Sequence, residues 1–563
     1  MENTDIFSTF HRKKYLEQMA EGKLDVIIIG GGITGAGIAL DAASRGLKVG
    51  LVEKQDFSAG TSSRSTKLVH GGLRYLKQGE IKLVREVGRE RAILHQNAPH
   101  IVIPEKMLLP LVDNGTYGKM ATSVGLWLYD RLAGVKQEER RVMLSKKQTE
   151  ELEPLLRKDI LRGGGLYIEY RTDDARLTIE VMKTAHSYGA LCVNYAEVSQ
   201  FIYKDRKVIG VQVKDQLTSK IYEIYTKKIV NAAGPWVDQL RDMDGSLEGK
   251  RLHLTKGVHL VVPYHRLPLK QSVYFDVPDG RMIFAIPRES STYIGTTDTN
   301  YHGNIEKPTV SKEDVDYLLS AVNHMFPNAK LKIGDISSSW AGLRPLIHED
   351  GKSPSELSRK DEIFYSSSGL ITIAGGKLTG FRKMAERVVD IVMSQLKEEY
   401  GFKYKPCITD KIVLSGGDFT SSLQEYINER IDMAKLSGLN EKHVVSLVYR
   451  YGTNTLKVLE KAEKLKQGLD FNQSIHNTDI LVAVAEMHYA IEEEMVANLN
   501  DFLIRRTGRL FFERDNLASY YKILLEEMAR IFGWTQQMKQ TYLDEFEEEY
   551  KQVVEFNHEA NHV

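Results

Sequence analysis

The sequence predicts an α/β protein followed by an all-helical C-terminal domain, and three observations support this fold class. Residues 24–30, LDVIIIG, form a short continuous apolar run rich in β-branched residues, which is typical of a strand buried on both faces of a parallel sheet. Later segments, such as RMIFAIPR at 281–288 and STYIGTTDT at 291–299, indicate a mixed or antiparallel sheet. From about residue 417 the chain is charged and helical in period, with few strand signals.

Composition excludes several classes of protein. The 76 basic residues balance the 76 acidic ones, and a nucleic-acid-binding protein usually carries a basic excess. The two cysteines, Cys192 and Cys407, have neither C-x-x-C nor zinc spacing, so we expect a reducing compartment and no metal site. No window approaches the roughly 18 apolar residues needed to cross a bilayer.

Residues 1–23 are predicted to form a helical N-terminal extension. Aromatic and apolar residues close to helical spacing lie beside a basic run, namely Phe7, Phe10, Tyr15 and Met19 beside Arg12, Lys13 and Lys14. A basic amphipathic helix of this kind can lie in a membrane interface. A helix packed on its own domain is the interpretation that we favour, because surface amphipathic helices are common.

A glycine-rich turn follows the first strand. Gly30, Gly32 and Gly35 form G-x-G-x-x-G between this strand and a predicted helix, and the next strand ends at Glu53. This context turns a weak motif into a dinucleotide-binding fingerprint. Gly30 would make the tight turn, Gly32 would let the backbone approach a pyrophosphate, and Gly35 would let the helix pack on the strand. Glu53 would accept hydrogen bonds from the adenosine ribose.

The fingerprint does not distinguish NAD from FAD, but a second glycine turn does favour FAD. Residues 371–388, ITIAGGKLTGFRKMAERV, again read as strand, turn and helix. Gly375 and Gly376 would end the strand, and a helix starting near Thr379 would point its N-terminus at the pyrimidine edge of a flavin. The positive end of that helix would favour reduced flavin.

The polar stretch TSSRSTKLVHGGLRYL, residues 61–76, lies between the ribose end and the predicted reacting centre. We expect hydrogen bonds to pyrophosphate oxygens from the hydroxyls of Thr61, Ser62, Ser63 and Ser65. Gly71 and Gly72 would permit close approach to a flat ring, which would place His70, Arg74 and Tyr75 near the reacting centre. The alternative is an exposed Ser/Thr loop with a surface arginine.

These residues resemble the N-terminus of the FAD-dependent glycerol-3-phosphate dehydrogenases. The resemblance continues through YRTDDARL, VNAAGPWVD, KGVHLVVP, IGTTDT, WAGLRPL and AGGKLTGFRK, in the order and spacing of that family, across about residues 24–395. The helical C-terminal part, with YRYGTNTLKVL, resembles the family more loosely.

The resemblance implies a Rossmann-like FAD-binding domain with a mixed β-sheet substrate domain, as in D-amino-acid-oxidase-like flavoproteins, plus the helical domain. We expect an N-terminal extension at 1–23, interleaved FAD and substrate domains at 24–400, and a helical domain at 411–563. The FAD parts are expected at about 24–105, 160–250 and 335–400. The resemblance extends the cofactor-binding set to Thr34, Lys67, Leu68, Ala233, Gly234, Lys377 and Leu378.

The family oxidises sn-glycerol 3-phosphate to dihydroxyacetone phosphate and passes electrons to quinone. Arginine binds a phosphate in a fork and lysine as a point charge. The resemblance picks out Arg74, Arg344 and Lys377 for this role, with Tyr75 beside them and Arg359 as a weaker candidate. Loss of the C2 proton needs a base with a pKa near neutrality, and His70 and His259 are both candidates.

Two competing functions remain open at this stage. One is a glycerophosphate oxidase that uses oxygen, although such relatives carry a mid-chain insertion that is not evident here. The other is a non-catalytic flavoprotein, which the presence of Arg74, Arg344 and Lys377 disfavours. The family relation further implies a homodimer in the cytoplasm, with peripheral contact to the inner face of the membrane, where quinone resides.

Overall fold

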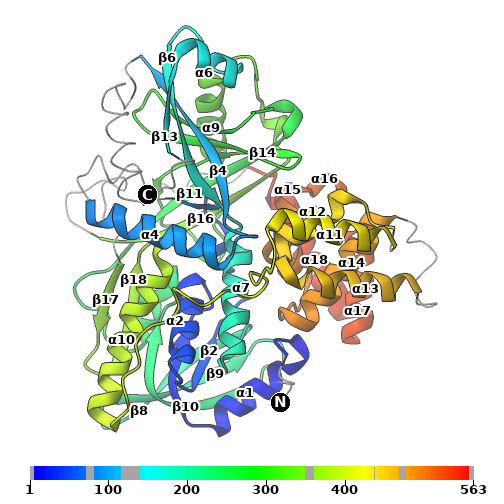
Figure 1. The fold of residues 1–563 in the computed structure, drawn as a ribbon. Helices are drawn as coiled ribbons and strands as arrows, with labels where there is room; N and C mark the ends of the chain where they lie inside the picture. Colours follow the sequence, from blue (N-terminus) through cyan, green and yellow to red (C-terminus); the bar gives the residue numbers. More distant parts are fainter. Residues whose placement is uncertain are drawn as a thin grey trace.

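The computed structural model describes residues 6–70, 81–113, 115, 140–348, 361–436, 438–467 and 477–556, which fold into two sheets and a helical domain. Figure 1 shows one sheet above the other, with the helical domain beside them. The chain passes between the sheets several times, so that segments distant in sequence meet where the sheets adjoin. The predicted fold class, α/β with mixed sheets and a helical C-terminal domain, is confirmed.

The lower sheet in Figure 1 has the strand order β17-β18-β10-β1-β2-β7, in which β18 to β7 are parallel and β17 is antiparallel to β18. Strand β1 pairs in parallel with β2 and β10, and all its residues are buried, which explains its continuous apolar run. Strands β8 and β9 form an antiparallel extension on the first half of β10. The bounds are β1 Leu24–Ile29, β2 Val49–Val52, β7 Leu191–Val193, β8 Ala196–Lys204, β9 Lys207–Asp215, β10 Ile221–Asn231, β17 Asp361–Tyr365 and β18 Leu370–Gly375.

Three helices form a layer on this sheet. Helix α2 (Ile33–Ser44) lies between α7 (Asp174–Ser187) and α10 (Phe381–Tyr400), as Figure 1 shows. The side chain of Asp173 caps α7 by accepting a hydrogen bond from the amide of Arg176. Helix α10 ends at Gly401, whose φ of 72° is a left-handed conformation that glycine adopts easily.

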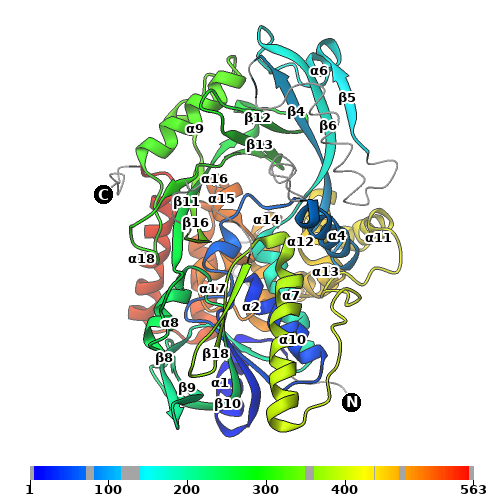
Figure 2. The same cartoon turned by 90° about the vertical axis from the view of Figure 1, so that its left-hand side faces the viewer.

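The upper sheet is mostly antiparallel, with the order β15-β11-β14-β13-β12-β4-β6-β3, β16 on β11 and β5 on β6. Strands β13 and β14 form the predicted antiparallel pair, while β12 and β4 are parallel. Helix α9 lies against this sheet (Figure 2) and begins with a capping box at Ser311. The bounds are β3 Leu68–Val69, β4 Ile103–Val112, β5 Val142–Ser145, β6 Leu161–Arg171, β11 Leu252–Pro263, β12 Ser272–Asp276, β13 Met282–Arg288, β14 Ser291–Gly295, β15 Thr299–Asn300, β16 Ser338–Ile347, α6 Lys146–Leu152 and α9 Lys312–Met325.

The C-terminal part is helical, and no described residue after Gly375 belongs to a strand. It is tied back to the upper sheet after α18, where the carbonyl of Val553 accepts the hydroxyl of Ser339 at 2.8 Å. The helices are α11 Leu423–Leu436, α12 Glu441–Tyr451, α13 Thr455–Gln467, α14 Thr478–Glu493, the π-helix Asp501–Arg506, α15 Arg509–Phe512, α16 Arg514–Leu517, α17 Tyr521–Phe532 and α18 Gln536–Gln552.

Helix α1 (Arg12–Glu21) packs on its own domain. Phe7, Tyr15 and Met19 are at most 4% exposed, whereas Phe10 is 55% exposed. The apolar face is therefore used inside the molecule, as the favoured interpretation of the N-terminus expected. Among the described residues, none of the helices combines the length and the apolar character needed to cross a membrane.

The remaining helices are short, apart from α4, which runs between the two sheets. They are α4 Ile81–Asn97, α8 Val237–Met243 and the 3-10 turns Thr9–His11, Thr61–Ser63, Gly234–Trp236, Tyr264–Arg266, Ile333–Asp335, Leu378–Gly380 and Gly452–Asn454.

Candidate active site

A cavity opens where strands β1, β2, β10 and β18 end. Because these strands run parallel, their carboxyl ends meet at one edge, which is where open α/β sheets bind ligands. The cavity contains about 1210 Å³ of empty space, including its open mouth, which is ample for a dinucleotide.

Twelve of the residues predicted to bind cofactor line this cavity: Gly30, Gly32, Thr34, Glu53, Thr61, Ser62, Ala233, Gly234, Gly375, Gly376, Lys377 and Leu378. They come from five separate segments, so the fold brings both glycine turns to one cavity. Other residues also line the cavity and were not predicted from the sequence, including Lys54, Gln55, Trp236, Gln239 and Pro345. Trp236 and Pro345 lie inside motifs that had been singled out, VNAAGPWVD and WAGLRPL, and adjacency within those motifs was the available signal.

The first glycine turn has no space for side chains. A Cβ on Gly30 would lie 2.6 Å from the carbonyl oxygen of Ala232, and its φ of 116° also disfavours other residues. A Cβ on Gly35 would lie 1.9 Å from the carbonyl oxygen of Gly30. Helix α2 starts immediately after Gly32, so its N-terminal amides face the cavity. This bare, positively polarised turn fits a pyrophosphate.

Glu53 ties the turn to the end of β2. Its carboxylate accepts hydrogen bonds from the amides of Gly31, at 2.7 Å, and Gln55, at 2.8 Å. Burial raises the pKa of Glu53, while these two backbone hydrogen bonds oppose the rise. Each carboxylate oxygen has further acceptor capacity, so the predicted hydrogen bonds to a ribose remain available.

The polar stretch after β2 divides into two parts. Thr61 and Ser62 line the cavity, and the Ser62 hydroxyl accepts from the amide of Ile33 at the start of α2, 2.9 Å away. Ser65 and Lys67 instead bind the carboxylate of Asp174, the first residue of α7, at 2.6 and 2.5 Å. Asp174 lies in the motif YRTDDARL, but its role in holding Ser65 and Lys67 was not predicted from the sequence.

Six predicted cofactor residues lie outside the cavity lining: Gly35, Ser63, Ser65, Lys67, Leu68 and Thr379. Gly35 allows α2 to pack closely, as predicted for it, and Leu68 is a buried residue of β3. The hydroxyl of Thr379 donates to the carbonyl of His70 at 3.3 Å. Cofactor contacts from these six residues remain predictions.

The second glycine turn follows β18. Gly375 and Gly376 have φ values of 79° and 84°, a region that favours glycine, and Lys377 follows them on the cavity wall. The 3-10 turn Leu378–Gly380 comes next, and α10 begins at Phe381, two residues beyond the predicted helix start. The end of this strand and the turn up to Leu378 therefore line the cavity, whereas the first residues of α10 are not among the lining residues.

Arg344 is on β16; the next residue, Pro345, lines the cavity, whereas Arg344 is not among the lining residues. Its guanidinium donates to the carboxylate of Asp298 at 3.1 Å and to the hydroxyl of Thr296 at 2.9 Å. The side chain is 20% exposed, so the fork is held in place while remaining reachable. Both terminal nitrogens already donate to residues 296–298, so an oxyanion would bind by sharing or replacing these hydrogen bonds.

The two candidate histidines have different environments. His259, on β11, is 1% exposed and stacks on Trp340, with ring centroids 4.8 Å apart. Its Nε2 lies 3.0 Å from the hydroxyl of Thr66. Burial, followed by the charges of Arg344 and Lys67, holds the pKa of His259 well below its usual range. His70 is half-buried, with its ring 6.4 Å from that of Phe284.

Five predicted residues lie outside the described part of the chain: Gly71, Gly72, Arg74, Tyr75 and Arg359. The structure therefore neither brings them to the cavity nor separates them from it.

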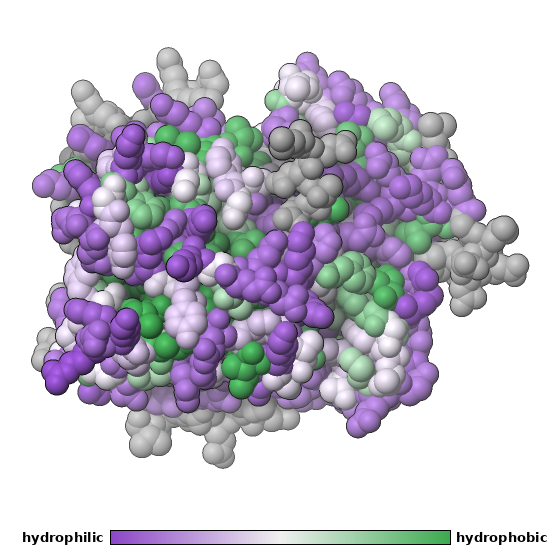
Figure 3. Space-filling model, turned by 90° about the horizontal axis from the view of Figure 1, so that it is seen from below, coloured by the Kyte–Doolittle hydropathy of each residue, from purple (hydrophilic) through white to green (hydrophobic). Residues whose placement is uncertain are grey.

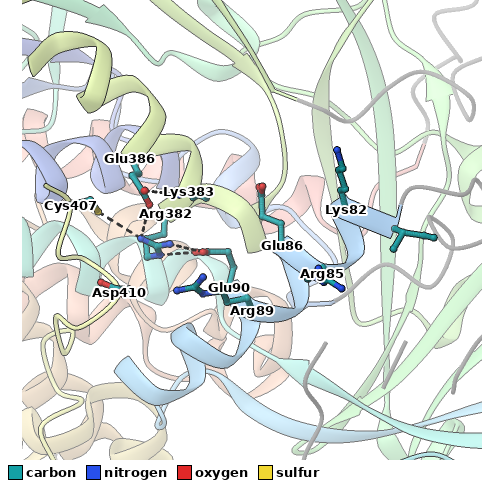
Figure 4. Close-up of a pocket in the computed structure, with 11 residues that line it drawn as sticks. Lys82, Arg85, Glu86, Arg89, Glu90, Arg382, Lys383, Glu386, Cys407 and Asp410 are labelled. Atoms are coloured by element: carbon teal, nitrogen blue, oxygen red, sulfur yellow. Dashed lines mark hydrogen bonds and ion pairs between the residues drawn. The ribbon is translucent and has the colours of Figure 1, made fainter. Parts of the chain in front are cut away.

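A second pocket lies between α4 and α10 (Figure 4). Arg382 points toward Glu90 and donates to it at 2.5 and 2.7 Å, and Lys383 pairs with Glu386 at 2.5 Å. The cations Lys82, Arg85 and Arg89 on α4 are exposed. The buried charges of this pocket thus satisfy each other.

Three features define a dinucleotide-binding α/β protein: the glycine turn at the ends of parallel strands, the N-terminus of α2 and the second glycine turn. Comparison with known proteins makes the class more specific. A family model described as "FAD dependent oxidoreductase" matches residues 25–382, and one described as "C-terminal domain of alpha-glycerophosphate oxidase" matches residues 407–539.

Similar proteins cover nearly the whole chain. The aerobic glycerol-3-phosphate dehydrogenase of Bacillus subtilis is 54% identical over 96% of both chains. That of Staphylococcus aureus strain USA300 is 50% identical over 98% of this chain and 99% of its own. The structure of glycerol-3-phosphate dehydrogenase from Bacillus halodurans, complexed with FAD, is 46% identical and covers 99% of this chain and 100% of its own, with a TM-score of 0.84.

This chain therefore belongs to the FAD-dependent oxidoreductases, in the family of the aerobic glycerol-3-phosphate dehydrogenases. The resemblance stated from the sequence motifs is confirmed, and so is FAD as the cofactor. The glycine turns and the uncluttered cavity fit this group.

Proposed function

We propose that this protein oxidises sn-glycerol 3-phosphate to dihydroxyacetone phosphate with FAD and passes the electrons to a quinone, as a step of glycerol catabolism. The observations that carry the proposal are the FAD cavity and, on the strand whose residue Pro345 lines that cavity, the Arg344 guanidinium held by residues 296–298. The relatives that match across almost the whole chain are named for oxidation of this substrate.

The residues of the cavity have distinct tasks in this proposal. Gly30, Gly32 and the N-terminus of α2 would hold the pyrophosphate, and Glu53 the ribose. The turn from Gly375 to Lys377 would hold the ring end. FAD, when bound, supplies the acceptor for the substrate hydride.

Arg344 would bind the substrate phosphate. The loop 296–298 holds its fork through three partners: the Thr296 hydroxyl, the Thr297 carbonyl and the Asp298 carboxylate. Such preorganisation reduces the entropy lost on binding an oxyanion. The family resemblance adds Lys377, Arg74, Tyr75 and Arg359 to the phosphate-binding set.

His259 would accept the proton of the C2 hydroxyl, because its low pKa keeps the imidazole neutral at physiological pH. His259 comes two residues after Gly257 on β11. Its side chain therefore points to the same face of the sheet as the Arg344 guanidinium, which covers Gly257. Its Nδ1 has no hydrogen-bond partner among the described residues and is free to take a proton. His70 is the alternative acceptor.

Anaerobic titration with glycerol 3-phosphate tests the proposed reaction. The expected result is bleaching of the bound flavin, with one dihydroxyacetone phosphate formed per flavin reduced. A bound flavin that stays oxidised in the presence of this substrate would contradict the proposed reaction. The assignment to the FAD-dependent family would still hold, because the protein would have retained FAD.

The electron acceptor requires a separate test, because the C-terminal family model carries the description of an oxidase. Turnover should be fast with a soluble quinone analogue and slow with oxygen. Hydrogen peroxide formed in proportion to the substrate consumed, at a rate equal to that with quinone, would instead favour a glycerophosphate oxidase.

Transfer to a membrane quinone requires peripheral contact at the inner face of the membrane, and we propose this location together with a homodimer. Ile6 and Phe10 are exposed close to Lys13 and Lys14, a combination that suits an anionic lipid surface. On the lower face of the molecule, however, hydrophilic side chains separate the apolar patches, so any contact would be shallow (Figure 3). Vesicle flotation and analytical ultracentrifugation test the two proposals.

A further inference from the structure

The helical domain reaches the FAD site through one buried carboxylate. Asp56 lies in the segment that follows β2, and its side chain is fully buried. It accepts hydrogen bonds from Arg505 at 2.6 Å and from both terminal nitrogens of Arg506 at 2.8 and 2.9 Å. These arginines end the π-helix of the C-terminal domain, about 450 residues further along the chain. Short π-helical turns are frequently found at functional sites.

The segment that carries Asp56 is part of the cavity wall. Glu53 and Gln55 line the cavity, and Glu53 accepts the amide of Gly31. On the other side of Asp56, the amide of Ser58 donates to the carbonyl of Gly31 at 3.0 Å, and Phe57 packs on Gly31. Residues 53–58 therefore hold both polar groups of Gly31, the middle residue of the pyrophosphate turn.

The contact between Asp56 and the two arginines fixes the orientation of the side chains as well as pairing their charges. Arg506 is completely buried and also donates to the carbonyl of Glu494, which orients its fork. Arg505 shares its guanidinium between Asp56 and Asp501. The cluster has two acidic and two basic side chains, Asp56 and Asp501 with Arg505 and Arg506, so its charges balance. Neither arginine lines the cavity.

We propose that Arg505 and Arg506 are positioning residues for FAD: by holding Asp56 they set residues 53–58 against the pyrophosphate turn, so that the C-terminal helical domain contributes to FAD affinity without touching the cofactor. The consequence is reciprocal. FAD binding should tighten the docking of the helical domain, because two linked equilibria must stabilise each other equally.

The test is Arg506→Met, compared with Arg450→Met as a matched control. Arg450 and Arg509 both bind the buried carboxylate of Glu486 inside the helical domain, and within the described residues neither has a hydrogen bond or ion pair with residues 53–58. Each substitution therefore removes one of two arginines from a buried carboxylate, and both should lower the thermal midpoint of the apoprotein. The dissociation constant of FAD from full-length apoprotein is then measured by flavin fluorescence.

We expect Arg506→Met to raise the FAD dissociation constant by about three- to thirtyfold, the range for coupling through packed networks. Arg450→Met should leave it unchanged, and Arg506→Lys should restore part of the affinity. Amide hydrogen exchange in the peptide spanning 53–58 should accelerate in Arg506→Met alone. The KM for glycerol 3-phosphate at saturating FAD should not change in either variant.

An unchanged FAD dissociation constant in Arg506→Met, or an equal rise in Arg450→Met, would overturn the proposal. If Arg506→Met does not fold, Asp56→Asn replaces it, because this isosteric change removes the charge and keeps the side-chain volume. Asp56→Asn should raise the FAD dissociation constant in the same way, and an unchanged value would overturn the proposal equally.

Discussion

The guanidinium of Arg344 lies directly over Gly257, on the neighbouring strand. A Cβ on Gly257 would lie 2.3 Å from Nη2 of Arg344. The guanidinium can occupy this position only because residue 257 has no side chain. Strands β11 and β16 are paired antiparallel here, with Gly257 opposite Gly342 and Arg344 opposite Thr255. The phosphate-binding proposal thus depends on two residues, one that supplies charge and one that supplies space.

Arg344→Ala should lower kcat/KM for glycerol 3-phosphate about tenfold to more than a hundredfold, since charge-assisted hydrogen bonds to phosphate are worth roughly 1.5–3 kcal/mol. Glycerol, which has no phosphate, should lose far less. Arg344→Lys should recover only part of the activity, because the fork is lost. Steady-state kinetics with both substrates measure this. Equal losses on both substrates would place Arg344 in the flavin site or the fold.

Gly257→Ala should reproduce part of the Arg344→Ala effect while leaving the charge present. The added methyl group displaces the guanidinium, so we expect a higher KM for glycerol 3-phosphate and a normal FAD content. The matched control is Gly334→Ala, at a position where a Cβ meets nothing within 4 Å. Unaltered kinetics in Gly257→Ala would show that the fork binds substrate from another position.

Glu53→Ala should weaken FAD binding, because it removes both a proposed ribose ligand and the carboxylate that accepts the amide of Gly31. The KM for glycerol 3-phosphate in the FAD-loaded fraction should stay nearly the same. Equilibrium dialysis of the apoprotein gives the affinity. Retention of wild-type affinity would point to a different residue at the ribose.

His259→Asn should lower kcat by about a hundredfold or more if His259 accepts the substrate proton. Because the pKa of His259 lies well below its usual value, kcat/KM of the wild type should not fall through an acid limb near pH 6.5. A pH profile measured on wild type, His259→Asn and His70→Asn separates the candidates. A larger loss in His70→Asn, with an acid limb that it abolishes, would transfer the role to His70.

His100 gives a prediction for stability. Burial lowers the pKa of His100 to about 3, so the folded protein keeps it neutral, whereas the unfolded chain protonates it near its ordinary pKa of about 6.5. Between pH 6.5 and about pH 3 the unfolded chain therefore binds a proton at His100 that the folded protein does not bind. Acidification in this pH range lowers the free energy of unfolding. The contribution lost between about pH 7.5 and 5.5 is about 1.4 kcal/mol.

His100→Phe should remove this part of the pH dependence, because the ring is enclosed between Gly416 and Gly452 without hydrogen-bond partners among the described residues. Thermal midpoints of both proteins at the two pH values measure the difference. An identical decline in wild type and variant would show that other groups account for it.

Local pattern alone was sufficient for much of this protein. Four features depend only on neighbouring residues, so each is visible in one short window of sequence. They are the parallel core strand, the glycine fingerprint, the acidic residue at the end of β2 and the change to helix after residue 417. The second glycine turn was also predictable, because Gly375 and Gly376 follow an apolar strand. The α10 helix started two residues later than predicted, since a 3-10 turn precedes it.

The tertiary structure alone decided which polar residues face the cavity and which support it. Ser62 and Ser65 look equivalent in sequence, yet one lines the cavity and the other binds Asp174, more than 100 residues away. Likewise, nothing near Asp56 indicates its partners, because Arg505 and Arg506 reach it only after the helical domain has docked. Hydrogen bonds and buried ion pairs depend on distances in space, and the sequence encodes these through the whole fold rather than through any local pattern.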